Sequence, residues 1–407
     1  VGAGKTLAAV LASRVIGARL TVIVAANATL ERWREEILRA FPNSTVIVKE
    51  RDIAAIDLAT PTYLVVNYES FQQTWSETLV TNLVATHTVD FVVLDEVQSV
   101  RQRFPASDSR RRRLVELLLD GAAQRNPELR VLGMSATPVI NTLHEAKTLL
   151  ELVTGEALAD LHLKPTVSNA VKMHQKLILH GIRYRPKYQM DIDTRLVEVD
   201  GRSIFEQLRA VPSRDILKSE QVLLQAKLPV ISSWLRPGTL VFTQFVTGMT
   251  QPISDAVTRL GLKSGVFTGD EKTGLQQFLL RQVDVLIGSS PISTGVDGLQ
   301  RVCNRVVLVC LPWTGAEYEQ IIGRLHRQGS LFDKIEVIIP LVALRRGDAV
   351  WSWDQLRLQR IEWKRTLADA AVDGVIPQGQ LPSKEEMHEQ SLAALEDWYA
   401  ALRQTGL

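Results

Sequence analysis

The sequence predicts an α/β protein with two doubly wound parallel-sheet domains and a helical C-terminal tail. Two series of short apolar runs alternate with helical stretches, and such runs are typical of parallel strands that are buried on both faces. The alternation decays between the two series, which indicates a linker. The predicted boundaries are residues 1–155 and 215–345 for the domains, 156–214 for an irregular crossing segment and 346–407 for the tail.

β-Branched apolar runs predict the strands, and amphipathic runs predict the helices. In the first domain we expect strands at 21–25, 63–66, 91–94 and 130–134, and helices at 7–16 and 28–40. In the second domain we expect strands at 239–242, 265–267, 284–287, 305–310 and 334–339, and helices at 220–235, 250–260, 274–281 and 316–324. An isolated strand is expected at 194–199. Trp353 and Trp363 share helical spacing in the tail, and we expect them to pack onto the second domain.

Composition restricts the classes of function without choosing one. Of 407 residues, 45% are hydrophobic and 23% are charged, as in ordinary globular proteins. The net charge of +2 does not announce a nucleic-acid binder, so any such surface must be local. Cys303 and Cys310 lie in apolar runs and are expected to be buried free thiols. The chain has no zinc-type Cys/His spacing and no apolar run of about 18 residues, so we expect a reducing cytoplasmic setting and no membrane association.

The first six residues, VGAGKT, match the second half of the phosphate-binding pattern G-x-x-x-x-G-K-[ST]. The first glycine of that pattern would lie two positions before Val1. Gly2 and Gly4 let backbone N–H groups face a phosphate chain. Lys5 has the reach for β- and γ-phosphates, and the Thr6 hydroxyl is suited to ligate Mg²⁺. The alternative is a glycine-rich turn that precedes a helix.

Polar residues also follow two expected strands of the first domain. Asp95 and Glu96 end an apolar strand, where Asp95 is suited to hold Mg²⁺ and Glu96 to deprotonate an attacking water. Gln98 is expected near the γ-phosphate or in a coupling loop, with a solvated loop glutamine as the alternative. Ser135 and Thr137 follow the next strand and are suited to sense a neighbouring carboxylate. An ordinary turn with a capping hydroxyl is the alternative for these two residues.

The second half contains the pattern Q-x-x-G-R-x-x-R, in which Gln320, Arg324 and Arg327 are expected on adjacent turns of one helical stretch. Phosphoryl transfer builds negative charge on the γ-phosphate in its transition state. An arginine pair stabilises such charge, so both arginines are catalytic candidates. The alternative is a basic helix on the surface.

In this order, VGAGKT, DEVQ and SATP, followed by LVFTQF, STGVD and QIIGRLHR, resemble the motifs of a superfamily 2 helicase-type motor. The resemblance covers Val1 to about Ile339. It implies two tandem RecA-like domains that use ATP and Mg²⁺, with Gly295 and Asp297 at the nucleotide site. Within the superfamily, FTQF, LPW before the last motif, GRLHRQGS and the stretch 136–152 are similar to segments of the Swi/Snf-type DNA translocases. DEVQ and SATP stand where that group has DEAH or DEGH and TGTP.

The resemblance further implies that polar residues at strand ends follow a phosphate backbone without reading sequence. These residues are Asn27, Asn67, Tyr68, Thr243, Gln244, Ser293 and Thr294. Arg110 and Arg111, within the basic run that includes Arg101, Arg103 and residues 110–113, are expected to contact duplex phosphates, with a solvated loop entering a helix as the alternative.

The expected function is therefore a nucleic-acid-dependent ATPase, most concretely an ATP-driven translocase on duplex DNA. One alternative is a strand-separating DNA or RNA helicase of the same superfamily. An alternative of another class is a non-hydrolysing nucleic-acid clamp or assembly scaffold. A nuclease or methyltransferase partner docked on the tail is a further hypothesis, which the residues do not test.

Overall fold

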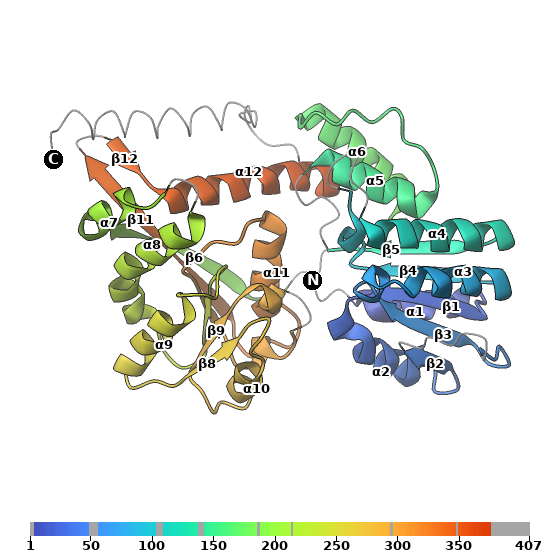
Figure 1. The fold of residues 1–407 in the computed structure, drawn as a ribbon, viewed down its shortest axis with the longest axis horizontal. Helices are drawn as coiled ribbons and strands as arrows, with labels where there is room; N and C mark the ends of the chain where they lie inside the picture. Colours follow the sequence, from blue (N-terminus) through green and yellow to red (C-terminus); the bar gives the residue numbers. More distant parts are fainter. Residues whose placement is uncertain are drawn as a thin grey trace. The chain divides into compact units, whose positions relative to one another are not determined.

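The computed structural model of the protein describes residues 4–48, 56–102, 109–136, 142–184, 188–212, 215–293, 296–346 and 349–375. The chain forms two compact units (Figure 1). Residues 2–185 with 367–376 make up the N-terminal unit, and residues 186–366 belong to the C-terminal unit. Each unit has its own sheet and its own hydrophobic cores.

Five parallel strands form the sheet of the N-terminal unit, in the order β2-β3-β1-β4-β5. They are β1 (Leu20–Ala25), β2 (Thr45–Val48), β3 (Thr62–Asn67), β4 (Phe91–Asp95) and β5 (Arg130–Met134). The strands β1, β3 and β4 are buried along their whole length, which explains their nearly continuous apolar sequences. Because all five strands run in one direction, their carboxyl ends meet at one edge of the sheet.

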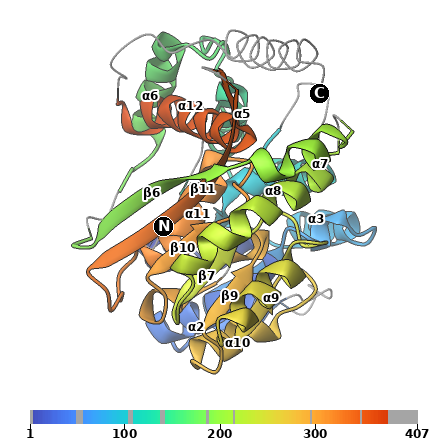
Figure 2. The same cartoon turned by 90° about the vertical axis from the view of Figure 1, so that its left-hand side faces the viewer.

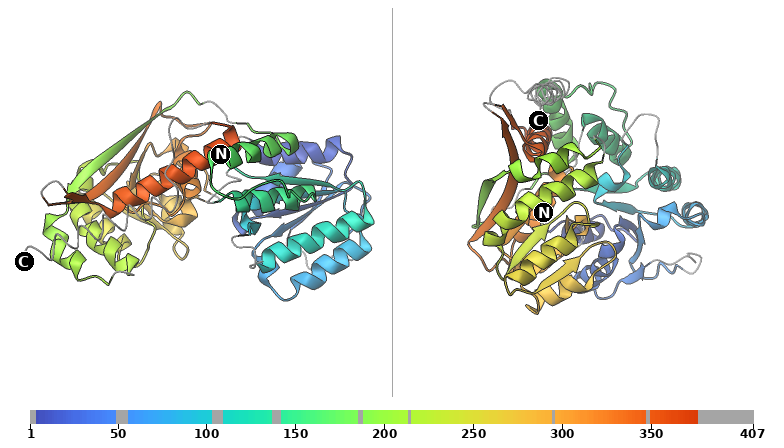
Figure 3. Two further views of the ribbon diagram at one scale, coloured as in Figure 1. Left: turned by 90° about the horizontal axis from the view of Figure 1, so that it is seen from above. Right: turned by 60° about the vertical axis from the view of Figure 1, so that its left-hand side comes forward.

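Helices cover both faces of this sheet (Figure 3). One face packs against α1 (Lys5–Val15) and α2 (Leu30–Ala40), and the other against α3 (Ser76–Thr86) and α4 (Arg110–Arg125). The remaining helices of this unit are α5 (Leu143–Thr154), α6 (Val167–His180) and the short 3₁₀ helices η1 (Asn27–Thr29), η2 (Ser70–Gln72) and η3 (Val97–Val100).

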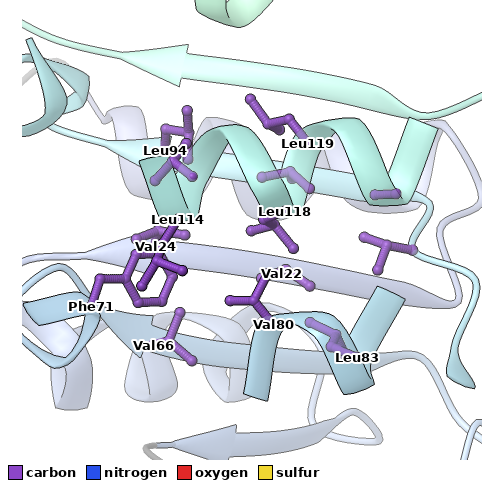
Figure 4. Packing of buried hydrophobic residues seen from close by; sticks show 14 of the residues in the cluster. Val22, Val24, Val66, Phe71, Val80, Leu83, Leu94, Leu114, Leu118 and Leu119 are labelled. Carbon is purple, nitrogen blue, oxygen red and sulfur yellow. The ribbon is translucent and has the colours of Figure 1, made fainter. Parts of the chain in front are cut away.

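The alternation of side chains along β1 decides which helices each residue meets. Val22 and Val24 lie in the core with Leu83 of α3 and Leu114 of α4, which Figure 4 shows from close by. Ile23 points to the other face and lies in the core with residues of α1 and α2. The strand is therefore apolar at every position although each face uses only half of it.

The C-terminal unit has a seven-stranded sheet (Figure 2). The order is β12-β11-β10-β7-β9-β8, and β6 also pairs with β11. The strands are β6 (Asp191–Asp200), β7 (Thr239–Phe242), β8 (Ser264–Phe267), β9 (Val285–Gly288), β10 (Arg305–Leu308), β11 (Lys334–Arg346) and β12 (Ala349–Trp351). Only the pairing of β12 with β11 is antiparallel among the described strand pairs.

Helices α8 (Ile216–Ile231) and α9 (Thr250–Arg259) share a core with one face of this sheet, and α10 (Thr273–Leu279) and α11 (Gly315–Leu325) share a core with the other. The other elements are α7 (Phe205–Arg209), α12 (Trp353–Asp373), η4 (Arg202–Ile204), η5 (Ser232–Trp234), η6 (Ser290–Ser293) and η7 (Leu299–Arg301). The predicted α/β class with two doubly wound sheets and a helix after the second sheet is confirmed.

The segment expected to be an irregular linker is more ordered than predicted. It contains α6, and the strand predicted to be isolated is β6, which pairs with β11 over ten residues from Asp191 to Asp200. Most side chains of β6 are exposed, so the strand lacks the apolar signature of its neighbours. Ion pairs across the two strands, Lys334 with Asp193 at 2.8 Å and Arg345 with Glu198 at 2.6 Å, accompany the backbone pairing.

Four buried charges fix the start of α12 on the C-terminal unit. Lys227 Nζ on α8 lies 2.6 Å from Asp354 Oδ1 and donates to the Val309 carbonyl at 2.7 Å. Arg357 Nη1 lies 2.5 Å from Glu220 Oε1. These four charged side chains are at most 4% exposed. A helix that carries two charges into the core can dock in one register only, because each charge needs its partner.

Three expectations about single residue types can be compared with the structure. The Trp353 indole donates to Glu220 at 2.9 Å, so the expected packing of this tryptophan onto the second domain is confirmed. Cys303 and Cys310 are buried free thiols, as predicted, and burial raises the pKa of each to about 12. Among the described helices, none is long and apolar enough to cross a membrane.

The buried pair predicts a large stability effect. Lys227→Met leaves the Asp354 carboxylate buried without its cation, and we expect a loss of about 3–5 kcal/mol in the free energy of unfolding. Arg345→Ala is the control, because it breaks a pair whose side chains are 57% and 58% exposed, and solvent screening should make its loss much smaller. Urea unfolding followed by tryptophan fluorescence measures both. Equal losses in the two variants would contradict this account of α12.

Candidate functional site

The candidate nucleotide site of the N-terminal unit lies where α1 begins and β4 ends. Gly4 precedes the helix with φ +76° and ψ +22°, in the left-handed region that glycine adopts without steric cost. Lys5 is the first residue of α1, and its Nζ donates to Glu96 Oε1 at 2.8 Å. Lys5 and Glu96, which lie 91 positions apart in the sequence and were predicted to act at one phosphate site, are thus in direct contact. Gly2 lies outside the described residues.

Glu96 is held from both sides. Lys5 occupies Oε1, and Gln98 Nε2 donates to Oε2 at 2.5 Å. The Glu96 backbone has φ +50° and ψ +56°, a left-handed conformation that costs a non-glycine residue about 1–3 kcal/mol. Gln98 is only 8% exposed, so the alternative of a solvated loop glutamine is wrong. The geometry orients one carboxylate at the expense of local backbone strain.

Asp95 carries a negative charge that its surroundings do not fully balance. It ends β4, is 8% exposed, and accepts a hydrogen bond from Trp33 Nε1 at 3.1 Å. Burial raises the pKa of Asp95, and the neighbouring Glu96 charge raises it further, while Lys5 and the Trp33 indole oppose the shift. Trp33 was not predicted as a site residue, because its spacing in α2 is equally that of an ordinary core tryptophan.

The oxygen donors at this edge fit Mg²⁺ better than a softer metal. Asp95 and the Thr6 hydroxyl, in the first turn of α1, are the predicted ligands, and Mg²⁺ prefers one or two such protein oxygens together with phosphate oxygens and water. Within the described ranges, no group of three or more His, Cys, Asp or Glu side chains could form a protein-only metal cage. Burial, followed by the Glu96 charge, raises the pKa of Asp95, and a cation bound to this carboxylate would oppose that shift.

The coupling segment after β5 is partly described. Met134 pairs with Asp95 across the sheet, so Ser135 follows at the level of Glu96. The adjoining Gly133 is required by packing, because a Cβ there would lie 2.6 Å from Val153 Cγ2. The next carbonyl, of Ala136, accepts a hydrogen bond from Arg183 at 3.2 Å. Thr137 lies outside the described residues.

The strand ends predicted to follow a phosphate backbone are brought together. Asn67 Nδ2 donates to Asn27 Oδ1 at 2.9 Å, and the Asn27 backbone N–H donates to Glu69 Oε2 at 3.2 Å. These contacts join the ends of β1 and β3. The Tyr68 ring does not share this surface, because the residue is 1% exposed. Its N–H donates to the Ala25 carbonyl at 3.0 Å, so neither the ring nor the N–H of Tyr68 is available to a polymer.

The predicted basic run does not form one surface. Arg112 is buried and donates to Glu116 Oε1 at 2.7 Å and to the Thr148 carbonyl at 3.2 Å. Arg101 forms an ion pair with Glu145 at 3.5 Å. These two arginines tie α4, α5 and η3 together. Arg110 and Arg111 remain partly exposed on the first turn of α4, whereas Arg103 lies outside the described residues.

In the C-terminal unit, Arg324 binds described residues of the STGVD motif. Its guanidinium donates to the Val296 carbonyl at 3.0 Å and to the Ser293 carbonyl at 2.5 Å. Arg327 pairs with Asp297 at 3.2 Å. The two arginines therefore bind three residues of this motif, Ser293, Val296 and Asp297. Gly295 and Thr294 lie outside the described residues.

One expectation about this motif is wrong. Gln320 and Arg324 share α11, but the helix ends at Leu325, so Arg327 is not on a third turn of one helical stretch. His326 leaves the helix with φ −83° and ψ +80°, after its N–H closes the last helical bond to Ile322. The ion pair with Asp297 then fixes the position of the Arg327 side chain.

The remaining predicted contacts lie at the ends of β7 and β9. Gln244 Nε2 donates to Ser290 Oγ at 3.0 Å, which joins the two strand ends. Thr243 and Ser293 are 0% and 5% exposed, and their hydroxyls donate to backbone carbonyls of Phe245 and Ser290. Their side chains are therefore engaged within the protein, and Gln244 is the more accessible member of this group.

Comparison with known proteins gives a family match for one domain and a likeness in fold for most of the chain. Residues 227–329 match the family described as the helicase conserved C-terminal domain. The Hef helicase domain of Pyrococcus furiosus is 14% identical, with a TM-score of 0.51, over 85% of this chain and 91% of that chain. The SWI2/SNF2 ATPase core of Sulfolobus solfataricus in complex with double-stranded DNA is 14% identical, with a TM-score of 0.39, over 91% and 87% of the two chains. No curated protein matches the chain.

The family match covers one domain, within residues 227–329, and the likeness to the Hef helicase domain shows the fold. The two doubly wound units have the fold of RecA-like domains in tandem and are followed by helix α12. The predicted resemblance to superfamily 2 helicases is confirmed for the fold and for the second domain.

The raised pKa of Asp95 predicts that its carboxylate destabilises the folded protein in a pH-dependent manner. The folded state binds this proton more tightly than the unfolded state, so the carboxylate lowers stability above its folded pKa. Asp95→Asn should therefore raise the melting temperature of the nucleotide-free protein at neutral pH. The gain should vanish as the pH falls below the usual aspartate range.

Asp193→Asn is the control with the opposite sign. The bond from Lys334, followed by the one from Arg195, lowers the pKa of Asp193, so its carboxylate adds stability that is lost as the pH falls. Thermal unfolding across the acid range measures both variants. A lower melting temperature for Asp95→Asn at neutral pH would contradict the unbalanced charge at the site.

Proposed function

We propose that this protein is a nucleic-acid-dependent ATPase motor, and that it moves along double-stranded DNA as a translocase of the Swi/Snf type. The observation that carries the proposal is the contact of Lys5 with Glu96 at 2.8 Å, beside Asp95 at one sheet edge. A phosphate-binding lysine, a metal-binding carboxylate and a general base are the groups that ATP hydrolysis needs from one domain.

The chemistry follows from how these side chains are held. Lys5 exchanges its contact with Glu96 for the phosphates of ATP, because a multiply charged anion competes for the ammonium group. Glu96 then faces the attacking water as general base, with Gln98 still orienting its second oxygen. Mg²⁺, when bound through Thr6 and Asp95, would neutralise phosphate charge. Arg324 and Arg327 are proposed to stabilise the charge that develops on the γ-phosphate.

The proposal that the protein is a motor also requires residues in both units that can contact a nucleic acid. Asn27 in one unit and Gln244 in the other carry amides at strand ends, and such groups bind phosphates without reading sequence. Asn67 is 8% exposed, and its amide holds Asn27 and Ser70. Arg110 and Arg111 add positive charge near the first group. A cycle of ATP binding and release that alternately tightens these contacts would move the protein along DNA in small steps.

The choice of duplex DNA translocation over strand separation rests on the sequence segments FTQF, LPW and GRLHRQGS. LPW also has a defined place: Trp313 is 43% exposed, its ring lies under the Arg357 guanidinium at 4.4 Å, and Phe245 of FTQF meets it edge-on at 6.1 Å. A non-hydrolysing clamp is the less favoured alternative, because the Lys5, Asp95 and Glu96 constellation would have no task in it.

The catalytic part of the proposal predicts the outcome of Glu96→Gln. The amide keeps the size of the side chain but cannot accept a proton, so ATP binding should persist while turnover falls by about 10²-fold or more. Glu128→Gln is the matched control on a side chain that is 84% exposed, and it should turn over normally. ATP binding and phosphate release measure the two steps. Retained hydrolysis in Glu96→Gln would remove this residue as the base.

The motor part is tested by two displacement assays on the same preparation. A duplex DNA translocase should displace a third strand from a triplex in an ATP-dependent manner and leave a tailed duplex paired. Glu96→Gln should displace no strand in either assay, because it is expected to bind ATP without hydrolysing it. The variant therefore distinguishes ATP-driven movement from binding alone. Strand separation of the tailed duplex without triplex displacement would favour the helicase alternative.

A further inference from the structure

Tyr68 is a buried residue whose hydroxyl forms no hydrogen bond within the described chain. The residue follows β3 directly, is 1% exposed, and its Oη has no hydrogen-bond partner within the described part of the chain. A buried hydroxyl without a partner is a cost to folding, since it gives up water and gains nothing. Phenylalanine would fill the same space without that cost, so the hydroxyl calls for a functional explanation.

Strand register places Tyr68 on the same face of the sheet as the catalytic turn. Val66 of β3 pairs with Val24 of β1, and Val24 pairs with Leu94 of β4, and all three lie in one core (Figure 4). Tyr68 is two residues beyond Val66 and belongs to that core. Val97, which follows Glu96 directly in the turn after β4, belongs to the same core, so the ring of Tyr68 packs in the cluster that adjoins the catalytic turn.

The charges around the phenol agree with this placement. Burial raises the pKa of Tyr68, and the Asp95 and Glu96 carboxylates raise it further, ahead of Glu69. The phenol therefore remains a protonated donor beside two carboxylates. Gln98 Oε1 is likewise buried without a hydrogen-bond partner in the described chain. Within the described chain, the Tyr68 hydroxyl and Gln98 Oε1 are thus two buried polar atoms without a hydrogen-bond partner, and both residues interact with Glu96.

Tyr68 also sits inside the segment that the proposed function gives to the polymer. Its neighbours Asn67 and Glu69 both bind Asn27, and its own N–H donates to the Ala25 carbonyl at 3.0 Å. A displacement of this loop by a phosphate backbone would therefore move the phenol as well. The residue is connected through its backbone to the polymer loop and through its side chain to the catalytic turn.

We propose that Tyr68 is a positioning residue that links the polymer loop to the general base, and that its hydroxyl donates to the Glu96 carboxylate when Lys5 turns to the phosphates of ATP. The inference rests on the proposed ATPase function. Lys5 donates to one oxygen of Glu96 and Gln98 to the other. When Lys5 turns to the nucleotide, its ammonium group no longer donates to Oε1, and the buried phenol is proposed to donate there in its place.

The test is Tyr68→Phe in the longest natural chain that contains this sequence, assayed with saturating duplex DNA. We expect kcat for ATP hydrolysis to fall about tenfold or more, which corresponds to one lost hydrogen bond to a charged group, with KM for ATP unchanged. The melting temperature should stay the same or rise, because the removed hydroxyl has no partner in the free protein. A merely structural tyrosine would not give this combination.

Tyr63→Phe is the matched control from the same strand. Tyr63 is also 1% exposed, but its side chain lies on the opposite face, where its hydroxyl bonds Ser13 Oγ at 2.7 Å. It should lose melting temperature and keep kcat, the reverse of Tyr68→Phe. An unchanged kcat in Tyr68→Phe, or a loss of kcat that accompanies a loss of melting temperature, would overturn the inference while leaving the ATPase in place. Absence of hydrolysis in the parent protein would overturn the proposed function, and the inference with it.

Discussion

Parallel strands of one sheet all end at the same edge, and this constraint places every polar group of the candidate site in the N-terminal unit. Asp95 ends β4 and Ser135 follows β5, so the two residues meet at this edge although they lie far apart in sequence. Lys5 begins α1, and its side chain reaches the same edge, where it contacts Glu96 at 2.8 Å. The buried apolar strands supply the stability, and the edge can therefore carry strained and charged residues such as Glu96.

The C-terminal unit uses buried charge in a different way. Lys227, Asp354, Glu220 and Arg357 do not meet a substrate; they fix α12 on α8, and Arg357 continues to the Leu311 carbonyl and the Trp313 ring. Apolar packing alone would permit α12 to slide or rotate by a small amount. Paired charges remove that freedom, so the segment before α11 is held in a defined position.

Most of the strands could be predicted because buried parallel strands have runs of β-branched residues. The contact between Lys5 and Glu96 could be anticipated because short motifs identify residues that act on phosphates. The exceptions have physical reasons. β6 is an exposed strand held by ion pairs, so it lacked an apolar pattern. Arg112 and Tyr68 have polar side chains that the fold buries, which local sequence does not reveal. Arg327 lies past the end of α11, a boundary that its motif spacing concealed.

The measurement that tests the account most directly is ATP hydrolysis by the longest natural chain, without polymer and with duplex DNA, single-stranded DNA or duplex RNA. The account predicts weak hydrolysis alone and strong stimulation by duplex DNA, because the amides at the strand ends must engage a phosphate backbone before Glu96 is productive. Stimulation by RNA alone would contradict the assignment to duplex DNA. No hydrolysis under any of the four conditions would contradict the central claim that Lys5, Asp95 and Glu96 form a catalytic site.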